Sequence, residues 1–254
     1  MKLARTIAEL ETASGTGLVP TMGALHDGHV ALLRAARQEN QIVVMSLFVN
    51  PSQFDEGTDF DAYPRDESRD LEIAEREGVD VVFAPTADEL YPPGFASWID
   101  PGETGAEGAA RPGHFRGVAT VCLKLFNLVR PERAYFGQKD AQQLAVIRHL
   151  VRDLNVPVRI RAVATVRDTD GLALSSRNRR LSADDRMRAL GLPQALASAV
   201  GKPDPVAAAR GSLNGLEPEY VEVLDLGDAR VLAAAIRVGS TRLIDNVLLE
   251  GELR

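Results

Sequence analysis

The sequence predicts an α/β protein with a parallel sheet, followed by a second, smaller α+β domain. Short apolar segments alternate with longer helical patterns up to about residue 165, which is the order of βαβ units. The apolar segments are continuous rather than alternating, as in strands that are covered on both faces. After Thr165 this alternation stops and a polar stretch begins, so we predict domains at 1–165 and 166–254.

The elements of the first domain follow from local patterns. Strands are expected at 17–20, 42–49, 79–84, 133–136 and 158–164. Apolar residues spaced by three and four predict helices at 30–37, 67–77, 117–129 and 141–154. Thr86 and Glu89 form a capping box for a further short helix. Residues 101–117, rich in glycine and proline, are expected to form a long loop.

The second domain begins with the polar stretch RDTDGLALSSRNRRLS. A helix is expected to begin where this stretch ends, and Ser182 and Asp185 could cap its start. A helical region interrupted by glycine and proline follows. Segments 220–224 and 241–250 have the composition of strands. Together these elements predict a small α+β domain.

Composition and charge narrow the classes of function. The 254 residues are 45% hydrophobic and 26% charged, which is typical of a globular protein with an ample core. The formal net charge of -7 argues against a nucleic-acid partner, because non-specific binding depends on many lysine and arginine contacts to phosphates. Small molecules are therefore the expected partners.

The cysteine content and the apolar pattern indicate a reducing compartment. Cys122 lies in an apolar run without a second cysteine in the chain, and we expect a buried, inert thiol. The N-terminal MKLARTIAELETASG lacks the apolar core of a signal peptide, and no stretch approaches a membrane span. We therefore expect a cytoplasmic protein without a membrane partner.

The first stretch that carries chemistry is VPTMGALHDGHVALLRAAR. An apolar strand end, a glycine-containing turn and a helix of good formers follow one another in it. His26 and His29 lie at the helix start, where free N–H groups and the helix dipole favour phosphate. Gly28 between them leaves room for a nucleotide, so both rings could donate hydrogen bonds to phosphate oxygens.

The same residues admit other interpretations. One histidine could lie on the surface while the other caps the helix. A zinc site is disfavoured because HExxH spacing and a cysteine cluster are absent. The dinucleotide pattern that starts at Gly15 has Pro20 where its third glycine should be, and Gly201-Lys202 lacks the rest of a Walker A motif. Nucleotide binding therefore depends on the histidines.

The second stretch is RAYFGQKDAQQLAVIRHL, in which 137–140 lie between a strand and a helix, at the ligand-binding edge of a sheet. Lys139 could neutralise phosphate charge, and Asp140 could accept a hydrogen bond from a ribose hydroxyl. Gln143, one turn further on, points an amide toward the same crevice. The alternative is an ordinary helix start with Asp140 as N-cap and Lys139 solvated.

The third stretch is GLALSSRNRRLS. Its serine hydroxyls and the guanidinium of Arg177 could grip a polyphosphate, and the flanking glycine permits the movement of a lid. The alternative is a solvated basic loop.

Two shorter stretches add polar residues. SLFVNPSQF ends a buried strand, and its Gln53 could bind the oxygens of an acid or could serve the turn around Pro51. RPGHFRG sets His114 in the long loop, which by itself does not define a site. His149 lies within a helical pattern and is expected to be structural.

Five blocks, in this order, resemble the signature blocks of the pantothenate synthetase family, the pantoate–β-alanine ligases: PTMGALHDGH, FVNPSQF, RPGHFRG, FGQKDAQQLAVIR and DGLALSSRN. The resemblance runs from about Leu18 to Leu181 and continues more weakly through YVEVLDL and TRLIDNVLLE. The HxGH pattern is also similar to that of a wider superfamily of nucleotidyltransferases and class I aminoacyl-tRNA synthetases.

This resemblance implies a Rossmann-type, doubly wound first domain, a C-terminal lid domain, a homodimer, and an enzyme that uses ATP with Mg²⁺. Pantoate would attack the α-phosphate of ATP, which gives pantoyl adenylate and pyrophosphate. β-Alanine would then displace AMP and form pantothenate. The resemblance does not identify the metal ligands.

Site residues are implied by matching the motif positions. Gln53 and Gln143 would bind pantoate, and His29 matches the position of the family's proton donor. The residues expected to stabilise charge during adenylation are His26, His29, Lys139 and Arg177. The residues placed against ATP are Met22, Gly23, Ala24, Leu25, His26, Asp27, Gly28, His29, Gly137, Gln138, Lys139, Asp140, Val166, Leu174, Ser175, Ser176 and Arg177. Many relatives carry glutamate where this chain has Gln138, and the C-terminal region is short.

Two other functions remain open on the residues alone. A nucleotidyltransferase acting on a phosphate monoester would use the same histidine helix, but it should need a cationic acceptor pocket rather than Gln53 and Gln143. A non-catalytic nucleotide sensor would bind ATP without carboxylate-dependent release of pyrophosphate.

Overall fold

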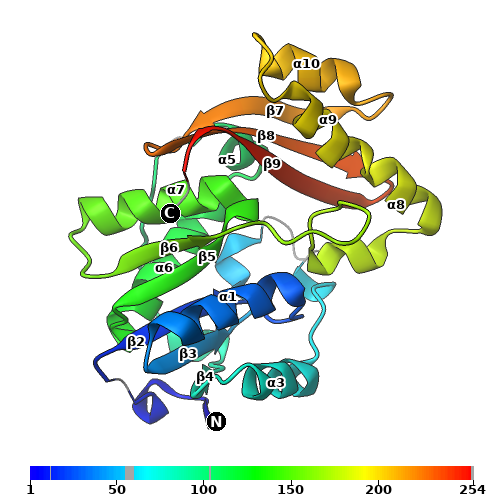
Figure 1. Ribbon diagram of the computed structural model, residues 1–254. Helices are drawn as coiled ribbons and strands as arrows, with labels where there is room; N and C mark the ends of the chain where they lie inside the picture. Colours follow the sequence, from blue (N-terminus) through cyan, green and yellow to red (C-terminus); the bar gives the residue numbers. More distant parts are fainter. Residues whose placement is uncertain (12, 55–59, 103, 253–254) are drawn as a thin grey trace.

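A parallel sheet forms the centre of the larger domain (Figure 1). The computed structural model describes residues 1–11, 13–54, 60–102 and 104–252. Six strands lie in the order β1-β4-β3-β2-β5-β6, and every neighbouring pair is parallel. They are β1 (Lys2–Ala4), β2 (Thr16–Thr21), β3 (Ile42–Leu47), β4 (Val81–Phe83), β5 (Arg133–Gly137) and β6 (Arg159–Val163).

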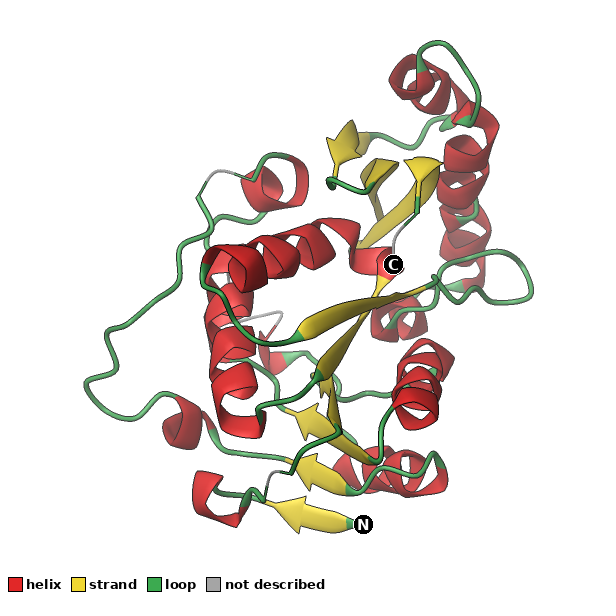
Figure 2. Cartoon of the chain, turned by 60° about the vertical axis from the view of Figure 1, so that its left-hand side comes forward, coloured by secondary structure: helices red, strands yellow, loops and turns green. Residues whose placement is uncertain are grey.

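Helices cover both faces of this sheet (Figure 2). Side chains alternate along a strand, so Leu18 and Val19 of β2 belong to different cores. Val19 packs with α1 (Asp27–Glu39) and α3 (Glu67–Arg76), whereas Leu18 packs with α6 (His114–Val129) and α7 (Ala141–Asp153). The prediction of a Rossmann-type, doubly wound sheet is thereby confirmed.

The strand order reverses between the neighbouring strands β2 and β5: β3 and β4 lie on the β2 side, and β6 lies on the β5 side. Chain connections leave these two strands in opposite directions, and a crevice opens at their carboxyl ends. β2 ends at Thr21 and β5 ends at Gly137, directly before the histidine and lysine stretches. The fold thus brings two predicted site segments to one edge.

Several predicted boundaries differ from the structure. Strand β1 was not predicted, because its three residues are too few to show a pattern. The 101–117 segment contains the short helix α5 (Ala106–Ala110), and α6 begins at His114 rather than at 117. The cap at Thr86 is confirmed, since its hydroxyl accepts a hydrogen bond from the N–H of Glu89 in α4 (Ala87–Leu90) at 3.3 Å.

The C-terminal domain is a three-stranded antiparallel sheet with helices on one face. The strands are β7 (Pro218–Asp225), β8 (Ala229–Val238) and β9 (Thr241–Gly251), and the helices are α8 (Ala183–Ala189), α9 (Gly191–Ala199) and α10 (Pro205–Ser212). The predicted α+β class is confirmed, as is the cap at Ser182, which accepts from the N–H of Asp185 at 3.1 Å. β8 was missed because its alanine run has low β propensity and shows no alternation.

The other face of the small sheet packs against the larger domain. Ala106 of α5 contacts Tyr220, and Ala141 of α7 lies with Leu226 and Val231. β6 ends at Val163, close to the predicted boundary between 165 and 166, which stays a prediction. No described helix has both the length and the apolar character that a membrane crossing requires.

Candidate active site

A cleft of about 1250 Å³ opens at the carboxyl ends of β2 and β5, between the large sheet and the C-terminal domain. Residues from all three chemistry-bearing stretches line it. They are Met22, His26, Gly28, His29, Gly137, Lys139, Asp140, Gln143, Leu174, Ser175, Ser176 and Arg177, and the predicted residues Gln53 and Val166 line it as well. The structure therefore brings the predicted stretches together around one space.

The remaining predicted residues do not line this cleft: Gly23, Ala24, Leu25, Asp27 and Gln138. Ala24 and Leu25 are buried, at 3% and 1% exposure, and their N–H groups donate to Asp70 rather than into the cleft. Asp27 is exposed. Gln138 contributes its carbonyl oxygen to a contact with Asn246 instead.

The histidines form the cap of α1 and also line the cleft. Nδ1 of His26 accepts from the N–H of Gly28 at 3.1 Å, and Nδ1 of His29 accepts from the N–H of His26 at 3.3 Å. The ring centroids are 4.1 Å apart. Because a backbone N–H can only donate, each neutral ring carries its proton on Nε2, where it can donate to a ligand. The alternative of one surface histidine and one cap is wrong.

Both histidines are held in the neutral form. Burial, together with the charge of Lys139, lowers the pKa of His26 to about 4. Burial and then the neighbouring His26 and Lys139 lower the pKa of His29 to about 3. At neutral pH the pair therefore offers N–H donors rather than positive charge, and the cation beside them is lysine.

Lys139 lies in a short 3₁₀ turn, η3 (Gln138–Asp140), that the C-terminal domain supports. The amide of Asn246 on β9 donates to the carbonyl oxygens of Gln138 and Lys139, each at 2.9 Å. Nζ of Lys139 lies 3.7 Å from Oδ1 of Asp140. Asp140 stands at the N-cap position of α7 without a side-chain capping bond, so its carboxylate remains at the cleft for other partners.

The serine and arginine stretch is docked against the larger domain. Ser175 caps η4 (Ser176–Arg180) by accepting from the N–H of Arg177 at 3.3 Å, and Ser176 is buried. Arg180 donates to the carbonyl oxygen of Ala62 at 2.8 Å, which ties this segment to the larger domain. The stretch is therefore only partly solvated: Ser176 is buried, whereas Arg179 and Arg180 are exposed.

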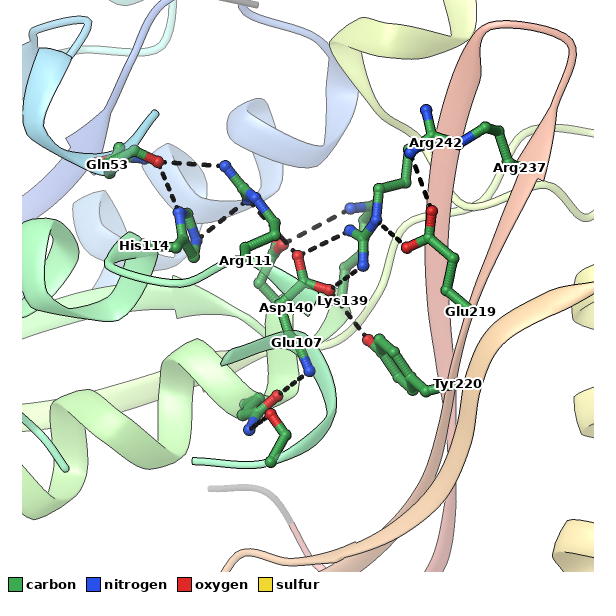
Figure 3. Close-up of polar contacts among 12 residues, drawn as sticks. Gln53, Glu107, Arg111, His114, Lys139, Asp140, Glu219, Tyr220, Arg237 and Arg242 are labelled. Atoms are coloured by element: carbon green, nitrogen blue, oxygen red, sulfur yellow. Dashed lines mark hydrogen bonds and ion pairs between the residues drawn. The ribbon is translucent and has the colours of Figure 1, made fainter. Parts of the chain in front are cut away.

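Gln53 is 8% exposed and firmly held (Figure 3). Its side-chain oxygen accepts from Asn50 at 3.0 Å, and its amide donates to the sulfur of Met22 at 3.1 Å. The main-chain carbonyl oxygen of Gln53 accepts from Nδ1 of His114 at 2.8 Å and from Arg111 at 3.2 Å. His114, weak as a sequence signal, thus anchors Gln53 from the start of α6.

The network continues through α5 to the C-terminal sheet (Figure 3). Nη1 of Arg111 lies 3.5 Å from Oε1 of Glu107. Glu107 accepts two hydrogen bonds from Arg242, which also donates to Glu219 at 2.6 Å. One wall of the cleft is therefore a continuous set of polar contacts between the two domains.

Other predictions concern residues outside this wall. Cys122 is buried, as predicted, and burial raises the pKa of its thiol to about 12, which disfavours the reactive thiolate. His149 is exposed on α7 and does not line the cleft. Among the described residues, no group of three or more His, Cys, Asp or Glu side chains could hold a metal ion by itself.

Sequence reasoning missed Asp70, Glu107, Arg242 and Asn246. Each acts on a segment far away in the chain, and none belongs to a local motif. Only a buried acid in an amphipathic helix, as at Asp70, offered a signal: an ionisable residue on the core-facing side of a helix needs a partner.

Comparison with known proteins gives consistent matches. Residues 1–248 match the family model described as pantoate-beta-alanine ligase. The chain is 50% identical to the pantothenate synthetase of Roseiflexus sp. (strain RS-1), over 98% of this chain and 100% of that protein. It is 50% identical to the pantothenate synthetase of Corynebacterium efficiens, over 98% and 99% of the two chains.

Solved structures agree. The pantothenate synthetase of Thermus thermophilus superposes with a TM-score of 0.92 at 43% identity, covering 98% of this chain and 99% of that one. The pantoate-beta-alanine ligase of Francisella tularensis, complexed with beta-gamma ATP and beta-alanine, superposes with a TM-score of 0.86 at 34% identity, over 100% of both chains.

Proposed function

The chain belongs to the pantoate–β-alanine ligase family, and from this premise we propose how its own residues carry out the reaction. The enzyme condenses pantoate with β-alanine, uses ATP, and forms pantothenate through a pantoyl adenylate with release of pyrophosphate and AMP. The observation that carries the residue assignment is the convergence of three distant stretches on one cleft.

In this proposal, ATP lies along the cleft with its phosphates at the start of α1. His26 and His29 donate from Nε2 to phosphate oxygens, and Lys139 supplies the positive charge. Arg177 and the serine hydroxyls beside it approach the same phosphates from η4. Positioned donors of this kind stabilise charge that grows on the α-phosphate and on departing pyrophosphate.

Pantoate lies beside Gln53 and Gln143, which both line the cleft. Its carboxylate is already ionised at neutral pH, so adenylation requires no general base. Hydrogen bonds to Asn50 and Met22 fix the side chain of Gln53, which favours attack from a defined position.

Magnesium is proposed to arrive with ATP. The ion usually keeps several waters and binds one or two carboxylates plus phosphate oxygens, and Asp140 is a carboxylate at the cleft that fits this pattern. Glu107 and Asp245 also line the cleft but are paired with arginines. The ion would lower the negative charge of the phosphates; Asp140 would orient it.

Three broader features belong to the same proposal. The C-terminal domain serves as the lid that keeps water from the adenylate, because hydrolysis would waste it. The protein is proposed to work in the cytoplasm, which suits a chain with a single, buried cysteine. A homodimer is proposed from the family resemblance and is tested by the mass of the protein in solution.

The test separates the two half-reactions. Purified protein is given ATP, Mg²⁺ and pantoate, and pyrophosphate and AMP are followed separately before and after β-alanine is added. Pyrophosphate should form in a pantoate-dependent burst, and AMP should rise only with β-alanine. A phosphate monoester in place of pantoate serves as the control.

Pyrophosphate release that depended on the monoester would favour a nucleotidyltransferase. ATP binding without any pyrophosphate release would favour a nucleotide sensor. Either result would contradict the ligase assignment.

A further inference from the structure

Asp70 is a buried carboxylate that the reaction does not use directly. It lies on α3, is 1% exposed, and does not line the cleft. The buried acids Glu107 and Asp245 are paired with arginines, whereas no described residue forms an ion pair with Asp70. A carboxylate buried without a counter-ion needs strong hydrogen-bond donors to offset its loss of water.

The turn between β2 and α1 supplies these donors. The N–H of Ala24 donates to Oδ2 and the N–H of Leu25 donates to Oδ1, each at 2.8 Å. Gly23 and Ala24 have φ angles of +80° and +51°, which turn the successive N–H groups toward the same side. Consecutive N–H groups of this kind form an anion-binding concavity, and hydrogen bonds to a charged group are stronger than those between neutral groups.

Asp70 therefore occupies the position that a ligand phosphate takes in many turns of this type. This explains why Ala24 and Leu25 do not face the cleft, although their sequence position suggests that they should. The fit is close: a Cβ at Gly23 would lie 2.7 Å from Oδ2 of Asp70 and 2.7 Å from Cδ1 of Leu47. With the backbone amides occupied, the phosphate-binding donors of this turn are the histidine rings.

The same hydrogen bonds fix the backbone from which the histidines project. His26 follows Leu25 directly, and its N–H donates to Nδ1 of His29. The position of this N–H decides which nitrogen of His29 accepts, and therefore which one carries a proton into the cleft. A shift of the Leu25 peptide would move the donor and the His29 ring together.

We propose that Asp70 is a positioning residue for adenylation, which holds the 23–25 turn so that His26 and His29 present Nε2–H donors to the phosphates of ATP. The proposal rests on the proposed function, because it takes these histidines as the phosphate donors. Asp70 aligns the histidine donors and does not contact the substrate. The affinity for pantoate, which lies beside Gln53, does not depend on it.

The decisive variant is Asp70→Asn, which keeps the size of the side chain. Its amide can accept from one of the two N–H groups but opposes the other with a donor of its own. We expect kcat for pantoate-dependent pyrophosphate release to fall about 10- to 100-fold per folded molecule, as misplacement by about 1 Å can produce. KM for pantoate should change less than twofold.

A spectroscopic measurement separates positioning from a purely structural role. The ¹⁵N shifts of the histidine rings should show the Nε2–H tautomer for His26 and His29 in the wild type and a mixture in Asp70→Asn. The control is Asp66→Ala on the same helix. Asp66 caps α3 by accepting from the N–H of Arg69 at 3.3 Å, so its loss weakens the helix start but leaves both N–H donors of the turn in place.

The control should keep the wild-type kcat and tautomers. A kcat for Asp70→Asn within twofold of wild type, or tautomers unchanged from wild type, would overturn the proposal. If Asp70→Asn cannot be purified folded, Asp70→Glu is measured instead: its extra methylene should lower kcat at constant KM for pantoate, and an unchanged kcat overturns the proposal. Wild-type protein that released no pyrophosphate would contradict the proposed function instead, and the tautomers would then decide the role of Asp70.

Discussion

Arg242 on β9 donates two hydrogen bonds, of 2.8 and 2.7 Å, to the carboxylate of Glu107 in α5 (Figure 3). Glu107 is only 6% exposed. Burial acts to raise its pKa, but the hydrogen bonds and charge of Arg242 outweigh burial and hold the pKa below its usual value. The hydroxyl of Tyr220 donates to the same carboxylate at 3.1 Å. This pair joins the segment before α6 to the C-terminal sheet.

The variant Glu107→Gln should lower the free energy of unfolding by about 3 kcal/mol, because it leaves the guanidinium of Arg242 without its buried counter-ion. Urea denaturation measures this change. The matched control is Glu219→Gln, which also removes a partner of Arg242 but at a more exposed position, with 28% of its side chain accessible. The control should cost about 1 kcal/mol or less. Equal losses of unfolding free energy in the two variants would show that the burial of Glu107 does not strengthen its ion pair with Arg242.

Gly117→Ala should damage both stability and pantoate binding. A Cβ at this position of α6 would overlap the carbonyl oxygen of Ser52 and lie 2.7 Å from the backbone nitrogen of Gln53. Overpacking against backbone costs about 1–3 kcal/mol, and the displaced turn should raise KM for pantoate more than KM for ATP.

A second helical glycine gives the comparison for this variant. Gly211 in α10 has no heavy atom within 4 Å of its would-be Cβ. Gly211→Ala should therefore stabilise the protein, by up to about 1 kcal/mol, through helix propensity alone. A Gly117→Ala protein as stable and active as wild type would disprove the close approach of 51–53 to α6.

Lys139→Ala should slow adenylation about 100-fold, near 3 kcal/mol, because the neutral histidines leave Lys139 as the cation beside them. Quenched-flow measurement of pyrophosphate without β-alanine reports this step directly. Lys202→Ala, at an exposed position away from the cleft, is the control and should keep the wild-type rate. An unchanged rate in Lys139→Ala would remove this lysine from the mechanism.

The free energy of unfolding should decrease as pH falls, because His26 and His29 are held neutral in the folded protein. Burial lowers the pKa of His26 to about 4 and of His29 to about 3, below the ordinary value of 6.5. Below pH 6.5 these two histidines bind protons in the unfolded chain but not in the folded chain. The contribution of the neutral pair is therefore complete above about pH 6.5 and is lost as pH falls toward 4, by about 1.4 kcal/mol per histidine and pH unit.

Urea denaturation at pH 7, 6 and 5 tests this dependence. The double variant His26→Gln/His29→Gln should lose less stability across the same range, since it retains the carboxylates but lacks the pair. Parallel curves for the two proteins would mean that the folded histidines titrate normally.

Much of the fold was predictable because it leaves local marks. Continuous apolar strands and helical spacing identified the parallel sheet, and cap residues such as Thr86 and Ser182 located helix starts correctly. The failures lie where local marks are weak. β1 is too short for a pattern, and the alanines of β8 pack well only because neighbouring strands and helices cover both of their faces.

The site divides in the same way. The amino-acid sequence by itself determined which side chains could meet a triphosphate, since His26, His29 and Lys139 follow strand ends within short motifs whose chemistry is readable. Only the tertiary structure decided how they are held. Asp70 lies 45 residues from Leu25, and Glu107 lies 135 residues from Arg242. A hydrogen bond between such partners depends on how β2, α3, α5 and β9 pack in space, and no local spacing of residues records that distance.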